Sequence, residues 1–264
     1  MNRHRTDAET EPLGQGITRI NEYDFANCYL IEGEREACLI DTGDGICELS
    51  AVVRQLTDKP LRVLITHAHA DHVGGAVWFP EVCIHPADLK TGKMYTEIFW
   101  RAYFLYCHRY KKKTHGVRYS DALQRTCRTR FKTYSEGDSF DLGGRTVEVF
   151  DTPGHSVGSV TLRDSLTGAV FAGDNLNPMV TLQYPYASTV KTWLKSAEKT
   201  LALAGDAPIY PGHGVGPVPR ETVEKAISLA EEAIKKGNGP RRRTRELRLE
   251  EKYPRLLYKE NRVL

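Results

Sequence analysis

The stretch THAHADH (residues 66–72) follows directly after the apolar run Leu61–Ile65, and it holds three of the nine histidines in the 264-residue chain. The β-rich run before it predicts a buried strand. His67 and His69 leave that strand two residues apart, so an extended backbone would point both side chains the same way. Two neighbouring imidazoles are half of a typical zinc site. The Asp-His pair that ends the stretch falls where the chain should turn into a helix, so the stretch could supply ligands to two adjacent metal ions.

Three later turns each place a ligand-type residue after an apolar strand and a glycine. They end in Thr-Pro-Gly-His155, Phe-Ala-Gly-Asp174 and Tyr-Pro-Gly-His213. Glycine lets the backbone approach a crowded site, and the site residues of α/β proteins gather at the carboxyl ends of strands. A metal bound by the heptapeptide can therefore draw its remaining ligands from these turns.

The succession HxHxDH, TPGH, AGD and PGH resembles the metallo-β-lactamase-fold hydrolase superfamily, in particular its glyoxalase II and lactonase-like branch. The similarity extends over about residues 15–90 and 135–235, and the upstream segments NCYLI and DTG fit it as well. It implies an α/β fold of the αββα four-layer sandwich type, in which two mixed sheets lie between outer helices. We expect one domain over residues 1–264, with a helical insertion at about 90–135 and a basic tail at about 238–264.

Carried onto the matching positions, the resemblance implies a complete set of metal ligands. The first metal would be bound by His67, His69 and His155, and the second by Asp71, His72 and His213, with Asp174 as the bridge. Two zinc ions are the expected cofactors, although His/Asp sites also accept iron or manganese. A water between two metals loses its proton near neutral pH, and Asp71 would then orient the hydroxide and move a proton to the leaving group.

Three further residues are candidates for roles beside the metals. Asp41, in the Asp-Thr-Gly turn, is either a simple turn residue or a group that hydrogen-bonds a ligand histidine. Tyr184 and Tyr186 follow Asp174 in a loop that we expect to hang over the metals. A tyrosine there could donate a hydrogen bond to a substrate carbonyl, and the alternative is that it only packs beneath a lid.

The resemblance implies a metal-dependent hydrolase that cleaves an ester, lactone or thioester bond with a metal-bridging hydroxide. Fold and metals alone do not choose the substrate. A mononuclear iron persulfide dioxygenase uses nearly the same ligands and stays open, as do phosphodiesterase and β-lactamase activity on the same site. The alternative outside enzymes is a partner- or nucleic-acid-binding protein that keeps the metals for structure.

The segment 90–135 is the feature that distinguishes this chain. It carries twelve lysines and arginines against two acids, although the whole chain has a net charge of only +3. Met94, Ile98, Ala102 and Tyr106 recur at helical spacing. The segment is either a helical hairpin that packs on the body or on a second copy in a homodimer, or a lid that binds an apolar acyl chain or an anionic small-molecule substrate.

The remaining composition points to a cytoplasmic protein. No apolar run approaches the length of about 20 residues that spans a bilayer, and the first residues lack the apolar region of a secretory signal. The six cysteines are scattered without metal or disulfide spacing, so we expect reduced thiols. The part of the chain outside the two basic segments is acidic, and no base-reading module is recognisable. Nucleic acid is therefore not favoured as the partner.

Further elements follow from the same patterns. Short apolar runs at 17–20, 27–31 and 37–40, separated by turns, predict an antiparallel meander. An amphipathic helix is expected over 188–203 with Ser188 as its N-cap, and another over 219–236 that ends at a glycine.

Overall fold

A computed structural model gives the fold, and it describes residues 8–110, 123, 127–239, 244–248 and 254–264. The parts of the predicted insertion at 111–122 and 124–126 lie outside the described residues. The chain divides into two compact units. We call Met1–Tyr134 with Phe140–Val147 the N-terminal unit, and Ser135–Ser139 with Glu148–Leu264 the C-terminal unit.

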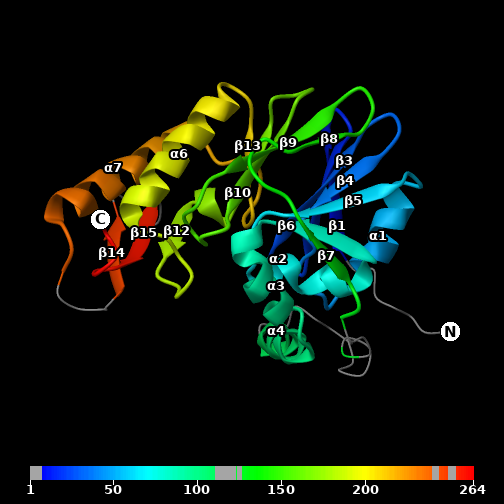
Figure 1. Cartoon of the computed structure of the whole chain (residues 1–264), viewed down its shortest axis with the longest axis horizontal. Helices are drawn as coiled ribbons and strands as arrows, with labels where there is room; N and C mark the ends of the chain where they lie inside the picture. Colours follow the sequence, from blue (N-terminus) through cyan, green and yellow to red (C-terminus); the bar gives the residue numbers. More distant parts are fainter. Residues whose placement is uncertain (1–7, 111–122, 124–126, 240–243, 249–253) are drawn as a thin grey trace. The chain divides into compact units, whose positions relative to one another are not determined.

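The N-terminal unit is built on a seven-stranded mixed sheet in the order β1-β2-β3-β4-β5-β6-β7, coloured from blue to green in Figure 1. β1 to β4 form an antiparallel meander, and β4 to β7 run parallel. The meander predicted from the apolar runs is therefore confirmed. The strands are Ala8–Gly14, Ile17–Glu22, Asn27–Glu32, Ala37–Ile40, Leu61–Ile65, Glu81–Ile84 and Arg130–Thr133.

Short helices follow the parallel strands of this unit. α1 (Leu49–Leu56) comes after β4, and α2 (Ala70–Val73) with η1 (Gly74–Trp78) comes after β5. η2 (Pro86–Asp88), α3 (Leu89–Tyr95) and α4 (Ile98–Tyr110) come after β6. The expected turn into a helix after His69 is present, because this segment buries apolar residues in the core of the unit.

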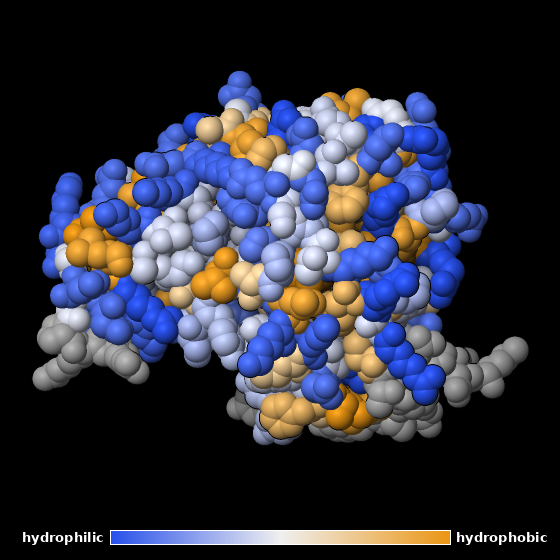
Figure 2. All heavy atoms as spheres, viewed as in Figure 1, coloured by the Kyte–Doolittle hydropathy of each residue, from blue (hydrophilic) through white to orange (hydrophobic). Residues whose placement is uncertain are grey.

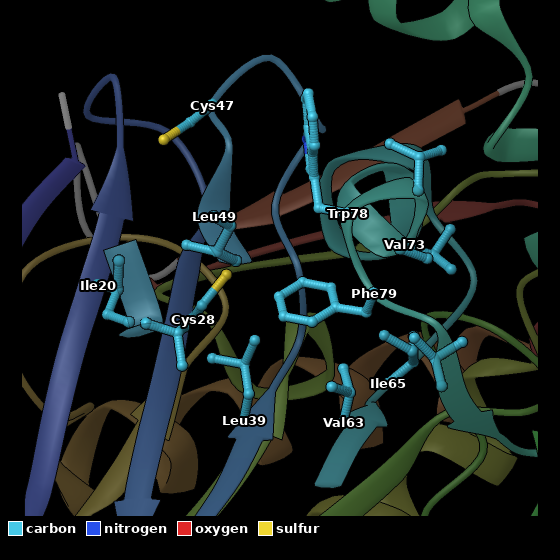
Figure 3. Close-up of a cluster of buried hydrophobic side chains, with 14 of the residues drawn as sticks. Ile20, Cys28, Leu39, Cys47, Leu49, Val63, Ile65, Val73, Trp78 and Phe79 are labelled. Carbon is cyan, nitrogen blue, oxygen red and sulfur yellow. The ribbon is translucent and has the colours of Figure 1, made fainter. Parts of the chain in front are cut away.

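The core of the N-terminal unit forms where apolar residues of successive strands come into register. β4 and β5 pair Leu39 with Val63, and both face the aromatic rings that follow α2. Each such side chain contributes roughly 1.5–3 kcal/mol by burial. Figure 3 shows the cluster, which includes Ile20, Cys28, Leu39, Val63, Ile65, Trp78 and Phe79.

The segment predicted as an insertion contains both helices outside the sheet and one strand of the sheet. Its described start is helical as expected, in α3 and α4. Its end forms β7, which pairs in parallel with β6 over Glu81–Ile84 and completes the sheet. A four-residue strand with the sequence Arg-Phe-Lys-Thr, mostly exposed at the sheet edge, lacks the apolar run on which the expectation of strands relied.

The second sheet has the order β13-β11-β10-β9-β8, and α6 (Val190–Ala204) and α7 (Arg220–Lys236) pack with residues of this region in a second core. Its strands are Ser139–Asp141, Thr146–Asp151, Val160–Asp164, Val170–Gly173 and Ile209–Pro211. Both helices were expected. The N-cap of α6 is Thr189 rather than Ser188, because the Thr189 hydroxyl accepts the bond from Thr192 N–H.

The basic C-terminal tail supplies strands to a third sheet, ordered β12-β15-β14. β12 is Met179–Leu182, η3 (Asp174–Leu176) precedes it, β14 is Thr244–Arg248, and β15 is Arg255–Lys259. β15 alternates buried Leu256 and Tyr258 with half-buried Arg255, Leu257 and Lys259, the pattern of a strand with one face in the core. Among the described helices, none has the length and apolarity to cross a bilayer.

Candidate metal centre

The heptapeptide brings its three histidines together inside the N-terminal unit. β5 ends at Ile65, and α2 begins at Ala70 with the extended residue His69 as its N-cap. The rings of His67 and His69 lie 4.9 Å apart between centroids, and those of His67 and His72 lie 4.2 Å apart. The turn from strand to helix thus gathers side chains that the sequence pattern pointed in two directions.

Asp41 fixes the orientation of two of these histidines from the end of β4. Its Oδ2 lies 2.9 Å from His72 Nδ1 and also accepts a 2.8 Å bond from the hydroxyl of Thr66. That hydroxyl in turn lies 3.1 Å from His67 Nδ1. A carboxylate only accepts, so both imidazoles carry their proton on Nδ1 and keep the Nε2 lone pair for a ligand.

Two supports of the heptapeptide were not predicted from the sequence. Asp88, at the end of η2, is buried, and its Oδ2 accepts the Ala68 N–H at 2.9 Å, between the two histidines of the HxH motif. The hydroxyl of Thr42 donates to the His72 carbonyl at 2.8 Å. An aspartate fifteen or more residues away from the motif carries no local signal, so only the fold reveals it.

The Asp41 turn also contains a buried pair of carboxyl groups. Asp44 N–H donates to Glu22 Oε2 at 3.3 Å, and both residues are almost completely inaccessible to solvent. Burial first, and then the neighbouring charge of Asp44, hold the pKa of Glu22 well above its ordinary value. Glu22 is therefore a group that binds its proton more tightly in the folded chain.

The C-terminal unit brings its own three candidates together from three turns. His155 follows β9, Asp174 follows β11, and His213 follows β13. Asp174 Oδ2 lies 3.4 Å from His155 Nε2 and 3.3 Å from His213 Nε2. These three residues are 58 positions apart in the sequence at their extremes, and three strands of one sheet, ordered β13-β11-β10-β9-β8, bring them together.

The His155 turn is held by side chains and backbone groups of the same unit. His155 Nδ1 lies 2.7 Å from the Thr181 carbonyl, which leaves Nε2 for a ligand. The side chain of Asn175 accepts the His155 N–H at 2.9 Å and donates to the Thr152 carbonyl at 2.9 Å. Asn175, which the sequence did not single out, lies directly after Asp174 and couples the two turns.

These separations fit a metal ion. Zinc binds histidine nitrogen and carboxylate oxygen at about 2.0–2.2 Å in a tetrahedron, whose ligand atoms are then roughly 3.3–3.5 Å apart. The two distances from Asp174 Oδ2 have this value. The candidate donors in both units are imidazoles and carboxylates, and Nδ1 of His67, His72 and His155 is engaged by a hydrogen bond, which is the outer support that metal ligands require.

The two tyrosine candidates lie in the segment after β12. The ring of Tyr184 is 5.7 Å from that of His155, nearly perpendicular to it. Arg262 donates to the carbonyls of Tyr184 and Pro185, and the Tyr186 carbonyl accepts the Val157 N–H at 2.9 Å. The backbone of this segment is thus held, and the two side chains are partly exposed.

A pocket of about 470 Å³ in the C-terminal unit does not include the ligand candidates. Its wall contains Lys191, Lys195 and Lys199 of α6 together with Asp151 and Pro153. Lys199 is held there by Glu136 at 2.7 Å. This lysine-lined hollow is therefore separate from the candidate metal ligands.

Comparison with known proteins identifies the family of this chain. The family model of the metallo-beta-lactamase superfamily matches residues 22–213. The chain is 28% identical over 226 residues to acyl-coenzyme A thioesterase MBLAC2 of Gallus gallus, covering 77% of this chain and 79% of that one. It is 29% identical over 196 residues to an atrochrysone carboxyl ACP thioesterase of Aspergillus chevalieri, covering 72% of this chain and 51% of that one.

A solved structure shows the same fold. A beta-lactamase domain protein from Burkholderia ambifaria superposes with a TM-score of 0.62 at 21% identity, covering 86% of this chain and 74% of that chain. The fold expected from the four motifs is confirmed. The chain belongs to the metallo-β-lactamase superfamily and is a metal-dependent hydrolase.

Proposed function

We propose that this hydrolase cleaves thioesters with two metal ions, bound by the ligands that the family pattern assigns. His67, His69 and His155 would hold one ion, Asp71, His72 and His213 the other, and Asp174 would bridge them. The observation that carries the proposal is the fixed orientation of the imidazoles in each unit, with Nδ1 engaged and Nε2 left for a metal. Two relatives with names of thioesterases support the choice of bond.

The chemistry divides between metals and side chains. When bound, the metal ions supply a water of lowered pKa and polarise the carbonyl of the substrate. Asp71, in the first turn of α2 and largely shielded from solvent, would orient that water and take up its proton. The water oxygen would add to the carbonyl carbon, the carbon–sulfur bond would break, and the proton taken up by Asp71 would pass to the departing thiolate. The products are a thiol and a carboxylic acid, and the acid releases its proton to solvent to become the carboxylate.

A thioester suits this arrangement better than an amide does. The leaving thiolate is the base of an acid whose pKa is about 8.5, so it departs without a strong proton donor beside it. Asp71 is the acid–base group that the family pattern assigns within the heptapeptide. Tyr184 or Tyr186 would add a hydrogen bond to the substrate carbonyl.

Metal content and hydrolysis of S-acetyl-N-acetylcysteamine, measured on the same preparations, test the proposal. We expect about two zinc ions per chain and turnover that a chelator abolishes. His67→Ala should lower kcat/KM by a factor on the order of 10²–10³. His85→Ala is the matched control, because His85 lies after β6, outside the proposed ligand set, where it accepts a bond from Ala87 N–H.

Two outcomes contradict the proposal. Equal turnover in His67→Ala and the unchanged protein would separate hydrolysis from the histidines. One iron per chain, with oxygen uptake that depends on a persulfide, would replace the thioesterase by the dioxygenase that shares these ligands.

A further inference from the structure

A series of aromatic rings begins at His69 and runs along α3 and α4 of the N-terminal unit. The ring of Tyr95, the last residue of α3, lies 6.0 Å from that of His69 and nearly perpendicular to it. The Trp100 ring lies 4.6 Å from Tyr95, 5.4 Å from Phe99 and 6.1 Å from Tyr103. We call Tyr95, Phe99, Trp100 and Tyr103 the aromatic wall.

The wall is held in place by the opposite face of α4. Arg101 and Leu105, one turn apart, are both buried, and Leu105 belongs to the core of the unit. Arg101 Nη1 donates to the Thr96 carbonyl at 2.9 Å, which ties α4 to the turn after α3. With that face fixed, Phe99 and Tyr103 must point away from the core, and they are 65% and 49% exposed.

The exposed apolar surface is concentrated in this one segment. Of the twelve exposed large hydrophobic residues in the described part of the chain, five fall within residues 94–106. Figure 2 shows hydrophobic side chains at the α4 end of the unit. A contiguous exposed apolar patch usually marks a binding surface. The five residues are Met94, Ile98, Phe99, Tyr103 and Tyr106.

We propose that the aromatic wall binds the apolar acyl chain of the substrate, on the side of the carbonyl that faces His69. This proposal rests on the proposed function, which places the reacting carbonyl at the metal held by His69. The acyl chain must extend from the carbonyl along some surface of the protein. The aromatic wall is such a surface, because its first ring, Tyr95, contacts the proposed metal ligand His69.

The chemistry of the wall favours the acyl chain over the carrier end of a thioester. Phosphates are bound by arginine forks, lysines or backbone N–H groups. Arg101, the arginine of α4 that follows Trp100 directly, is buried and bonded to the Thr96 carbonyl. Rings in edge-to-face contact instead present apolar faces and edges, against which methylene groups lose water-exposed area.

Hydrolysis of S-acetyl- and S-octanoyl-N-acetylcysteamine by Trp100→Ala, Trp100→Phe and the unchanged protein tests the wall. Both substrates are thioesters of the same phosphate-free thiol, so they differ only in the acyl chain. We expect Trp100→Ala to lower kcat/KM for the octanoyl thioester about tenfold, the value for losing the burial of roughly two methylenes. The acetyl thioester should change less than twofold, and Trp100→Phe should restore most of the octanoyl rate.

Leu166→Ala is the matched control, since Leu166 is another exposed large hydrophobic residue, on the β10–β11 turn. An equal loss on both thioesters would overturn the proposal, because the wall would then act only through the position of His69. Unchanged octanoyl hydrolysis would also overturn it, and so would a shift in oligomeric state by sedimentation without a change in chain-length preference. Absence of hydrolysis of both thioesters by the unchanged protein would instead refute the proposed function itself.

Discussion

The two units prepare their candidate ligands in different ways. In the N-terminal unit, seven consecutive residues carry four candidate ligand side chains, and a carboxylate from the neighbouring strand orients two of them. In the C-terminal unit, three separate turns carry one ligand each, and the nearest support of His155 is a backbone carbonyl. The histidines of a local motif are therefore oriented by side chains that hydrogen-bond to them. Ligands spread over several strands are oriented mainly by the backbone of the sheet.

The largest expected effect concerns how closely each ligand segment is packed. A Cβ on Gly75, just after the heptapeptide, would lie 1.9 Å from the carbonyl oxygen of Thr42, a backbone atom. Gly75→Ala should cost about 3 kcal/mol or more of unfolding free energy, because the turn after β4 has to move. The measurement is urea denaturation of the full chain.

The matched change in the C-terminal unit is Gly154→Ala. There the nearest atom is the side-chain oxygen of Asn175, 2.2 Å from the added Cβ, with Trp193 Cδ1 at 2.7 Å. Side chains move more readily than backbone, so the loss should be smaller than for Gly75→Ala. A larger loss for Gly154→Ala would reverse the comparison between the units.

The next effect concerns the groups that aim the histidines. Asp41→Asn places an NH₂ group against a donor in either orientation, because Thr66 N–H donates to Oδ1, while Oδ2 accepts from the Thr66 hydroxyl and lies 2.9 Å from His72 Nδ1. We expect metal affinity to fall about 10- to 100-fold, measured by competition with a chelator. Thr181→Val should cost less, since the Thr181 carbonyl stays in place for His155.

If Thr181→Val lowered metal affinity as much as Asp41→Asn, the backbone carbonyl would not be sufficient to orient His155. The hydroxyl of Thr181, 3.0 Å from His155 Nδ1, would then be the essential partner. The two units would in that case depend on side-chain support to the same extent.

The features that could be predicted from the sequence are the local ones, and those that depend on several strands could be predicted only in part. The heptapeptide, the strand before it and the meander were predictable, because spacing and apolar runs are local properties. His155, Asp174 and His213 were identified as candidates from glycine turns and family pattern. Their mutual distances of 3.3 and 3.4 Å depend on strand order, which no local pattern contains.

Elements whose stability comes from distant partners were missed. β7 has two basic residues and one aromatic in four positions, and it is a strand because β6 offers hydrogen bonds. β15, within the basic tail, is a strand because β12 and β14 flank it. Asp88 and Asn175 support ligand turns through hydrogen bonds from backbone N–H groups. Tertiary contacts override local preference in each of these cases.

The smallest expected effect concerns Glu22, a buried carboxyl that no sequence pattern indicated. Because burial and then Asp44 raise its pKa in the folded chain, folding takes up a proton once the pH exceeds the ordinary value of 4.5. Glu22 therefore contributes most to stability below that pH, and its contribution falls as the pH rises toward the folded-state pKa, by at most about 1.4 kcal/mol per pH unit. Glu22→Gln, which keeps the shape without the proton, should flatten the pH dependence of the urea midpoint between pH 5 and 8. Glu34→Gln, at an exposed position, should leave the slope unchanged, and a Glu22→Gln protein with the original slope would show that another group binds the proton.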